Sequence, residues 1–212
     1  MNSYASGNLQ SSIFNHQWLW AALGLILLAV SSAGILHGVR AGLAHVLYFQ
    51  AKYGSARDDA DRVLRLAERA HGLYPCNYNL CILAADAANP ASSVRDRDES
   101  ARRRALAERW CGTGLKLNFH QRQLRRLKTR LLASESLQEA VRYWEDYVEW
   151  QFWDPYNHAV LVELYGRAGD FEKARRSLNW VVGSDRYEEA LGAFQEAWSR
   201  EQRLTEPSGT PP

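Results

Sequence analysis

Four residues could together form a metal site, three cysteines and one histidine: Cys76, Cys81, Cys111 and His71. Thiolate and imidazole groups are the usual ligands of structural zinc, which takes four of them in a tetrahedral set. The first two cysteines are separated by four residues, and no CxxC pair is present. We therefore predict buried free thiols and no metal, with a zinc site as the alternative.

Two further histidines, His37 and His45, could ligate the metal of a haem or a chlorophyll. Both lie at or beyond the end of a long apolar segment. A histidine at such a position also hydrogen-bonds to lipid headgroups or water, and this interpretation is preferred. No cofactor is predicted, and a cofactor-carrying subunit stays as an alternative.

Motifs that mark common enzyme sites are absent from the sequence. It has no glycine-rich phosphate loop, no HExxH and no GxSxG, and no serine or cysteine has an obvious histidine partner. Catalytic groups assemble in space, so an enzyme remains an alternative. The prediction is a protein without catalytic activity.

Charged residues are distributed very unevenly along the 212-residue chain. Residues 1–39 contain no Lys, Arg, Asp or Glu, although the chain has 26 basic and 24 acidic residues. Hydrophobic residues make up 46% of the chain, which excludes collagen-like and fully disordered proteins. Residues 18–36 include only two polar side chains, both serines, and as a helix they match the hydrocarbon thickness of a bilayer.

We predict a single transmembrane helix over residues 18–39, preceded by a short polar tail over 1–17. A cleaved signal peptide is the alternative, but the segment lacks the basic start of a signal peptide and is too long. Arg40, Lys52 and Arg57 follow the apolar segment and no basic residue precedes it. This asymmetry predicts a single-pass membrane protein with its C-terminal domain in the cytoplasm.

Three glycines in this part of the chain, Gly34, Gly38 and Gly42, recur at every fourth position. This spacing places them on one helix face, as a strip of small residues that allows another helix to approach closely. We predict that the glycine strip packs against another membrane-protein subunit. The alternative is that glycine is simply common in membrane helices.

After residue 54, apolar residues recur at spacings of three and four, which predicts helices throughout and no strand. Breaker residues divide the helices at 74–75, 89–90, 112–114, 154–155, 169–170 and 183–184. The predicted fold class is all-α, with a transmembrane helix followed by a solenoid of helical hairpins. The predicted segments are a helical connector over 40–54, the helical domain over 55–203 and a disordered tail over 204–212.

Residues 157–182, NHAVLVELYGRAGDFEKARRSLNWVV, resemble a tetratricopeptide repeat (TPR). The residues that carry the resemblance are Leu161, Tyr165, Gly169, Asp170, Phe171, Ala174 and Leu178. Weaker repeat endings occur at Pro75, Phe119 and Pro155, and residues 187–198 suit a terminal capping helix. The resemblance implies about three repeats plus flanking helices.

The TPR resemblance implies protein binding, most often of a peptide or helix in a concave groove. We therefore predict a membrane-anchored interaction protein that acts as a subunit or assembly scaffold of a membrane protein complex. The alternative is a receptor at the membrane surface that captures client peptides transiently. Its partners would be other membrane-protein subunits, bound through the transmembrane helix and the repeats.

Basic residues are concentrated in the middle of the chain, with 12 basic and 4 acidic residues over 95–130 but 8 and 15 over 131–212. We predict that part of the basic region contacts anionic lipids. The residues proposed for this contact are Arg102, Arg103, Arg122, Arg126 and Arg130. Internal pairing with the acidic last third is the alternative, and no motif indicates nucleic-acid binding.

The densest aromatic region includes Trp144, Trp150, Trp153 and Tyr156. Aromatic residues at helical spacing usually fill the core between helices. Three tryptophans within ten residues exceed what one repeat core needs. We predict that one or two of these four side chains are exposed and bind a protein partner.

Overall fold

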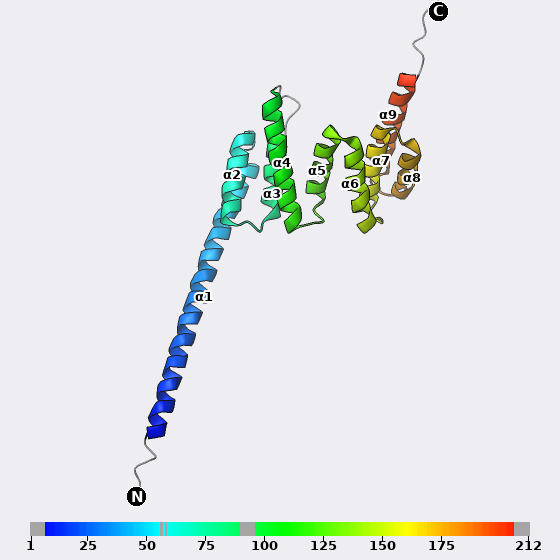
Figure 1. The fold of residues 1–212 in the computed structure, drawn as a ribbon. Coiled ribbons are helices and arrows are strands. Elements are labelled where there is room, and N and C mark those ends of the chain that lie inside the picture. Colours follow the sequence, from blue (N-terminus) through cyan, green and yellow to red (C-terminus); the bar gives the residue numbers. More distant parts are fainter. Residues whose placement is uncertain (1–6, 56, 58, 90–95, 206–212) are drawn as a thin grey trace, which may run out of the picture. The chain divides into compact units, whose positions relative to one another are not determined.

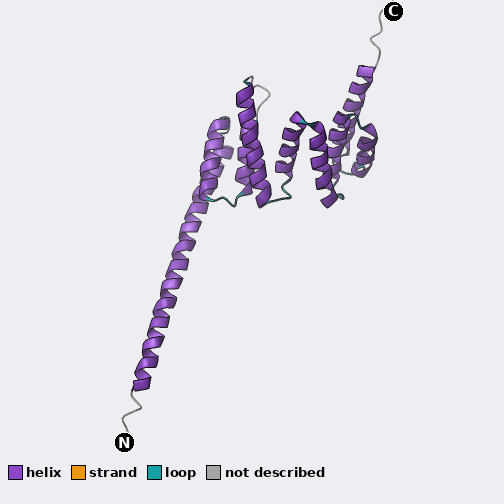
Figure 2. Ribbon diagram, viewed as in Figure 1, coloured by secondary structure: helices purple, strands orange, loops and turns teal. Residues whose placement is uncertain are grey.

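A computed structural model describes residues 7–55, 57, 59–89 and 96–205, with side chains described over 18–204 of these ranges. All regular secondary structure in the described residues is α-helical (Figure 2), which confirms the predicted all-α class. The helices are α1 (Gly7–Tyr53), α2 (Ala60–Leu73), α3 (Tyr78–Ala88), α4 (Arg97–Leu117), α5 (Arg122–Glu135), α6 (Leu137–Trp150), α7 (Pro155–Ala168), α8 (Phe171–Val181) and α9 (Tyr187–Thr205) (Figure 1). They form two compact units, Met1–Ala87 and Ala88–Pro212.

In the N-terminal unit, α1 is one continuous helix of 47 residues. Its part from Trp18 to Tyr53 is long and apolar enough to cross a membrane, and the most apolar stretch of that part is not buried in the protein. The helix includes the predicted connector over 40–54 up to Tyr53, and it begins at Gly7, within the predicted tail. The candidate span therefore continues without a break into the helical domain.

The last turns of α1 form a helix pair with α2. Ala44 packs with Ala70 of α2 and Leu80 of α3 in one apolar cluster. The Asp59 side chain caps α2 by accepting a hydrogen bond from the Arg62 amide. The end of α2 lies beside earlier residues of α1, since the Arg40 guanidinium donates to the Gly72 carbonyl at 3.4 Å. The two helices are thus antiparallel.

In the C-terminal unit, α7 and α8 form the helix pair that the sequence predicted over 157–182. Gly169 has a φ of 75°, a left-handed conformation that glycine adopts without strain, and ends α7. Asp170 caps α8 by accepting a hydrogen bond from the Lys173 amide at 3.1 Å. The predicted turn at these two residues is confirmed.

A tryptophan in the core joins α6 to α7. The Trp144 side chain is fully buried, and its indole nitrogen donates to the Asn157 carbonyl at 3.0 Å. The side-chain amide of Asn157 in turn donates to the main-chain carbonyl of Gln151 at 3.1 Å, in the loop between the two helices. These bonds satisfy polar groups that packing has removed from water.

The predicted break at 112–114 is wrong, because α4 runs through both glycines and ends at Leu117. A glycine inside a helix costs about 1 kcal/mol, which burial of one face offsets, and Gly114 is buried. The last helix is longer than predicted, since α9 continues to Thr205 and so includes Leu204 of the predicted tail. Residues 206–212, and 90–95 of the polar linker before α4, lie outside the described residues.

Candidate functional site

A groove of about 360 Å³ lies between α5, α7 and α9 in the C-terminal unit. Its lining consists of arginines, glutamates, alanines and one tyrosine: Arg126, Tyr156, Ala159, Glu163, Arg167, Arg186, Glu189, Ala190, Ala193, Glu196, Ala197 and Arg200. These three are alternate helices of the chain: α5 and α7 are each the first helix of a pair, and α9 follows the last pair. The groove lies on the face that they form.

Small residues hold the α7 and α9 backbones close together beneath the groove. A Cβ atom at Gly166 of α7 would lie 3.0 Å from the Cβ of Ala197 of α9, which is tighter than an ordinary contact. Ala190 and Ala193 are on the same side of α9 as Ala197, at spacings of three and four. Their short side chains leave the volume that forms the groove.

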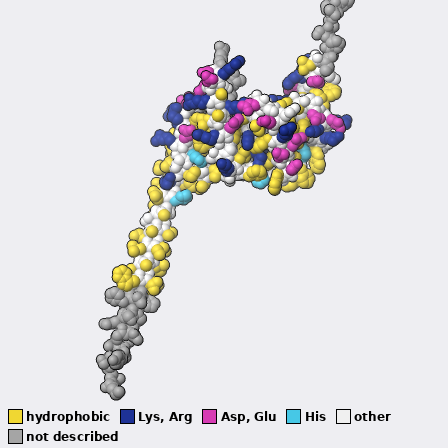
Figure 3. All heavy atoms as spheres, viewed as in Figure 1, with side chains coloured by type: hydrophobic (Ala, Val, Ile, Leu, Met, Phe, Trp, Pro, Cys, Tyr) yellow, Lys and Arg dark blue, Asp and Glu magenta, His cyan; other side chains and the backbone are white. Residues whose placement is uncertain are grey.

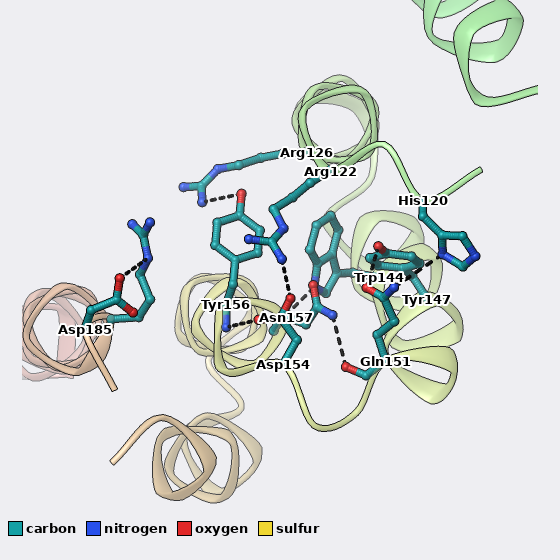
Figure 4. Close-up of polar contacts among 11 residues, drawn as sticks. His120, Arg122, Arg126, Trp144, Tyr147, Gln151, Asp154, Tyr156, Asn157 and Asp185 are labelled. Atoms are coloured by element: carbon teal, nitrogen blue, oxygen red, sulfur yellow. Dashed lines mark hydrogen bonds and ion pairs between the residues drawn. The ribbon is translucent and has the colours of Figure 1, made fainter. Parts of the chain in front are cut away.

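One end of the groove is formed by a tyrosine among arginines (Figure 4). The Arg126 guanidinium donates to the Tyr156 hydroxyl at 3.2 Å, and the Arg122 guanidinium carbon lies 4.4 Å from the centroid of the tyrosine ring. Burial lowers the pKa of Arg126, but Tyr156 and the charges of Glu163 and Glu189 raise it by more. Arg126 therefore stays charged, and the Tyr156 ring lies near three guanidinium groups, those of Arg122, Arg126 and Arg186.

Three of the arginines in the groove are neutralised by glutamates of the groove. The ion pairs are Arg126–Glu163 at 3.3 Å, Arg186–Glu189 at 3.0 Å and Arg200–Glu196 at 2.9 Å. They hold the lining side chains in place, although each pair at this exposure contributes little stability.

Two arginines at this site have no ion-pair partner among the described residues. Arg167 of α7 lines the groove, and Arg130 of α5 lies with it in a narrow recess that continues between the two helices. Both side chains are exposed. Because the other three arginines are paired with three glutamates, the site has an excess of positive charge and can bind an anionic group.

Of the residues predicted to bind anionic lipids, only Arg130 has no partner in the described part of the chain. Arg103 pairs with Glu99 at 2.7 Å, and Arg102 approaches the same carboxylate to 3.8 Å. Arg122 pairs with Asp154 and Arg126 with Glu163, so these two follow the alternative of internal pairing with the last third. Contact of these arginines with lipids stays a prediction.

The four predicted aromatic anchors lie in different environments. Trp144 is buried in the core, so its assignment as a partner-binding residue was wrong, because its ring fills the space between α6 and α7. Tyr156 is partly buried in the groove. Trp150 and Trp153 are 67% and 65% exposed and do not line the groove.

The glycine strip faces open space in the described structure. A Cβ atom at Gly34, Gly38 or Gly42 would meet no other atom within 4 Å. His37 lies edge-on to Tyr74 with ring centroids 5.5 Å apart, and His45 contacts Phe49 in the same way at 4.8 Å. Packing of the strip against a partner remains a prediction.

All three cysteines are free thiols. Cys76 is exposed, whereas Cys81 and Cys111 are buried, and burial raises the pKa of the Cys81 thiol to about 11. In the part of the chain that the structure describes, no three His, Cys, Asp or Glu side chains are grouped so that they could hold a metal ion.

The contribution of α9 to the groove was not predicted from the sequence. The signal that could have indicated it is the series Ala190, Ala193 and Ala197, with glutamates and arginines at neighbouring positions. An alanine stripe predicts close helix packing. The sequence predicts only a capping role for this segment.

No protein-family model matches the sequence, and no curated protein matches it. Among solved structures, the chain is similar to YrrB, described as a TPR protein with an unusual peptide-binding site. The match has 14% sequence identity and a TM-score of 0.49, and it covers 75% of this chain and 78% of YrrB. The described part of the chain itself is all-α, with paired helices and one long apolar N-terminal helix.

Proposed function

We propose that this chain is a non-catalytic, membrane-anchored interaction protein that serves as a subunit or assembly scaffold of a membrane protein complex. In this proposal the groove between α5, α7 and α9 receives an acidic segment of a partner protein. The observation that carries the proposal is the excess positive charge of the groove, from Arg130 and Arg167.

The chemistry of the groove suits a peptide that carries carboxylates. Arginine presents a planar set of donors that binds a carboxylate through two hydrogen bonds, and such charge-assisted bonds are stronger than neutral ones. The ring of Tyr156 offers an apolar surface next to the charges. A ligand with an acidic group near an apolar side chain would use both features.

The membrane anchor in this proposal is α1. Its apolar stretch from Trp18 has the length of a span, and its last turns pair with α2. A continuous helix would hold α2, which pairs with its last turns, at the membrane surface, on the cytoplasmic side according to Arg40, Lys52 and Arg57. The open glycine strip would then be the site where a second transmembrane helix packs.

Charge reversal tests the groove. The full-length protein with Arg130→Glu and Arg167→Glu should lose partners that co-purify with wild type in mild detergent. The control is Arg97→Glu with Arg175→Glu, which changes the net charge equally at exposed positions outside the groove. If the groove variant keeps its partners, or the control loses them equally, the proposal is wrong.

The second candidate function is a receptor that captures peptides transiently, and the openness of the groove to solvent favours it. The two functions differ in the lifetime of the complex. A scaffold should purify with partners in fixed stoichiometry, whereas a receptor should retain almost none after washing and should require crosslinking to detect its clients.

A further inference from the structure

Exposed apolar side chains in the C-terminal unit are concentrated at one edge. This edge is formed by the loops that connect one helix pair to the next, α4 to α5, α6 to α7 and α8 to α9. Figure 3 shows hydrophobic side chains gathered along the lower side of this unit. The apolar edge consists of Leu117, Phe119, Trp150, Phe152, Trp153, Trp180 and Val182, all between 42% and 67% exposed.

The three loops form one continuous surface. The ring of His120, after α4, lies within 3.4 Å of the Gln151 amide, after α6. Phe152 is edge-on to Trp180 near the end of α8, with ring centroids 6.1 Å apart. Trp180 also stacks on the ring of His158, with an interplanar angle of 10°. These contacts place the aromatic side chains in fixed positions relative to one another.

The opposite edge of the same unit is polar. The connections within the pairs contain Ser136, between α5 and α6, and Gly169 with Asp170, between α7 and α8. Among the described residues of this unit, only Trp198 and Leu204 are large, apolar and exposed without belonging to the apolar edge. This asymmetry indicates a surface for contact, since scattered exposed residues would occur on both edges.

Trp150 and Trp153 do not belong to the core between α6 and α7. The space between α6 and α7 is filled by Trp144, which is fully buried, while Trp150 and Trp153 remain mostly in solvent. An exposed aromatic cluster of this kind reduces solubility unless another phase or protein covers it. The cluster is therefore a candidate contact surface.

We propose that the apolar edge lies in the headgroup region of the bilayer that α1 crosses, as a second membrane contact of the protein. This inference rests on the proposed membrane anchoring by α1. Tryptophan is enriched at the boundary between lipid and water, because its ring is apolar and its N–H is polar. Three of the seven residues of the edge are tryptophans.

The charges at the edge favour neutral lipid over a charged partner. In the three loops, or directly beside them, Lys116, Arg122 and Arg186 are balanced by Glu149, Asp154 and Asp185, while Arg125, which contacts the Phe119 ring, is buried. Arg122 pairs with Asp154, and Arg186 approaches Asp185 to 3.7 Å. With no net charge, the edge would bind through its aromatic rings and would not depend on anionic headgroups.

The anchor supports a bilayer as the occupant. A domain tethered to a membrane meets that surface at a high effective concentration, so a small apolar contact is enough to hold it there. Within the N-terminal unit, taken alone, the corresponding loop between helix pairs begins at Tyr74, whose ring contacts His37 of α1. That loop therefore starts beside the end of the predicted span, where lipid headgroups would be.

Tryptophan quenching by brominated lipids tests this inference on the full chain. The protein with Trp18→Phe and Trp20→Phe, which removes the tryptophans of the span, is reconstituted into phosphatidylcholine vesicles. Bromine near the headgroup should quench its fluorescence more than bromine at the end of the acyl chain. Further exchange of Trp150 and Trp153 to Phe should remove most of this quenching while keeping the edge apolar.

The matched control is Trp198→Phe in the same background, since Trp198 is 44% exposed on α9 and packs beside Phe171 at 4.9 Å. It should leave the lipid quenching unchanged. Absence of quenching, or equal losses in the two variants, would overturn the inference. A protein partner bound to the apolar edge would also prevent the quenching, because it would shield the aromatic rings from lipid.

Carbonate extraction of the same vesicles separates this inference from the proposed function. If the protein is washed off, the proposed anchoring by α1 is wrong. If it stays and shows no lipid quenching, only the second membrane contact is wrong, because the groove and α1 do not depend on it.

Discussion

Replacing Gly166 with leucine should separate α9 from α7 and destabilise the helical domain. A Cβ atom at this position would already lie 3.0 Å from the Ala197 Cβ, where ordinary contacts begin at 3.4 Å. Gly166→Ala would therefore require Ala197 to shift by a few tenths of an ångström, and the additional atoms of leucine at this position cannot fit. Overpacking of this kind costs about 1–3 kcal/mol, of which the better helix propensity of leucine returns about 1 kcal/mol.

Gly192→Leu on α9 is the matched control. Its Cβ would meet no atom within 4 Å, so only the gain in helix propensity of about 0.5–1 kcal/mol remains. The two variants should thus differ by about 2 kcal/mol, or roughly 4–8 °C in melting temperature for a chain of this size. Thermal unfolding in detergent, followed by far-UV circular dichroism, measures this difference.

Gly166→Leu should also change the shape of the groove, because it would displace Ala197, which is one of the lining residues. Partner binding by Gly166→Leu should fall at temperatures where the domain is still folded, whereas Gly192→Leu should bind as wild type does. Equal melting temperatures for the two variants would show that α7 and α9 are not in close contact, and the description of the groove would be wrong.

Three further predictions concern other parts of the chain. Burial and, to a smaller extent, a hydrogen bond to the Glu145 carboxylate raise the pKa of Tyr165. The contribution of Tyr165 to the free energy of unfolding should therefore be constant up to about pH 10 and decrease at higher pH, because only the unfolded tyrosine ionises there. Tyr165→Phe should reduce this decrease in urea titrations between pH 9 and about 11. An alkylating reagent should label Cys76 in the native protein but not Cys81, and equal labelling would contradict the described burial. Gly38→Leu should release the protein from its membrane partners without loss of membrane insertion, whereas Leu27→Val should be tolerated, and unchanged co-purification would show that the glycine strip faces lipid.

Local signals of the sequence predicted the helix pairs well. The turn at Gly169 and Asp170 was predictable because a left-handed residue followed by a capping side chain is a local requirement. Gly112 and Gly114 predicted a helix break that does not occur, because burial of one face of α4 offsets their low helix propensity. Local patterns therefore fail where tertiary contacts decide the outcome.

The sites were harder to predict than the helices, because they depend on contacts across the chain. Arg125 and Arg126 are neighbours in one basic stretch, but the Arg125 side chain is buried 4.0 Å from the ring centroids of Phe119 and Tyr147. Arg126 instead faces the groove. No composition count separates the two, and only the packing of α5 on α6 and α7 does.

Site-specific photocrosslinking shows whether the groove holds an acidic segment of another protein. A benzoylphenylalanine residue at Ala193 of α9, which lines the groove, should crosslink a distinct partner in native membranes. The same residue at Asn179, which is exposed on α8 outside the groove, should not. Arg130→Glu with Arg167→Glu should abolish the crosslink, and the crosslinked partner peptide should be acidic. A crosslink of equal yield from Asn179, or none from Ala193, would contradict binding of such a segment in the groove.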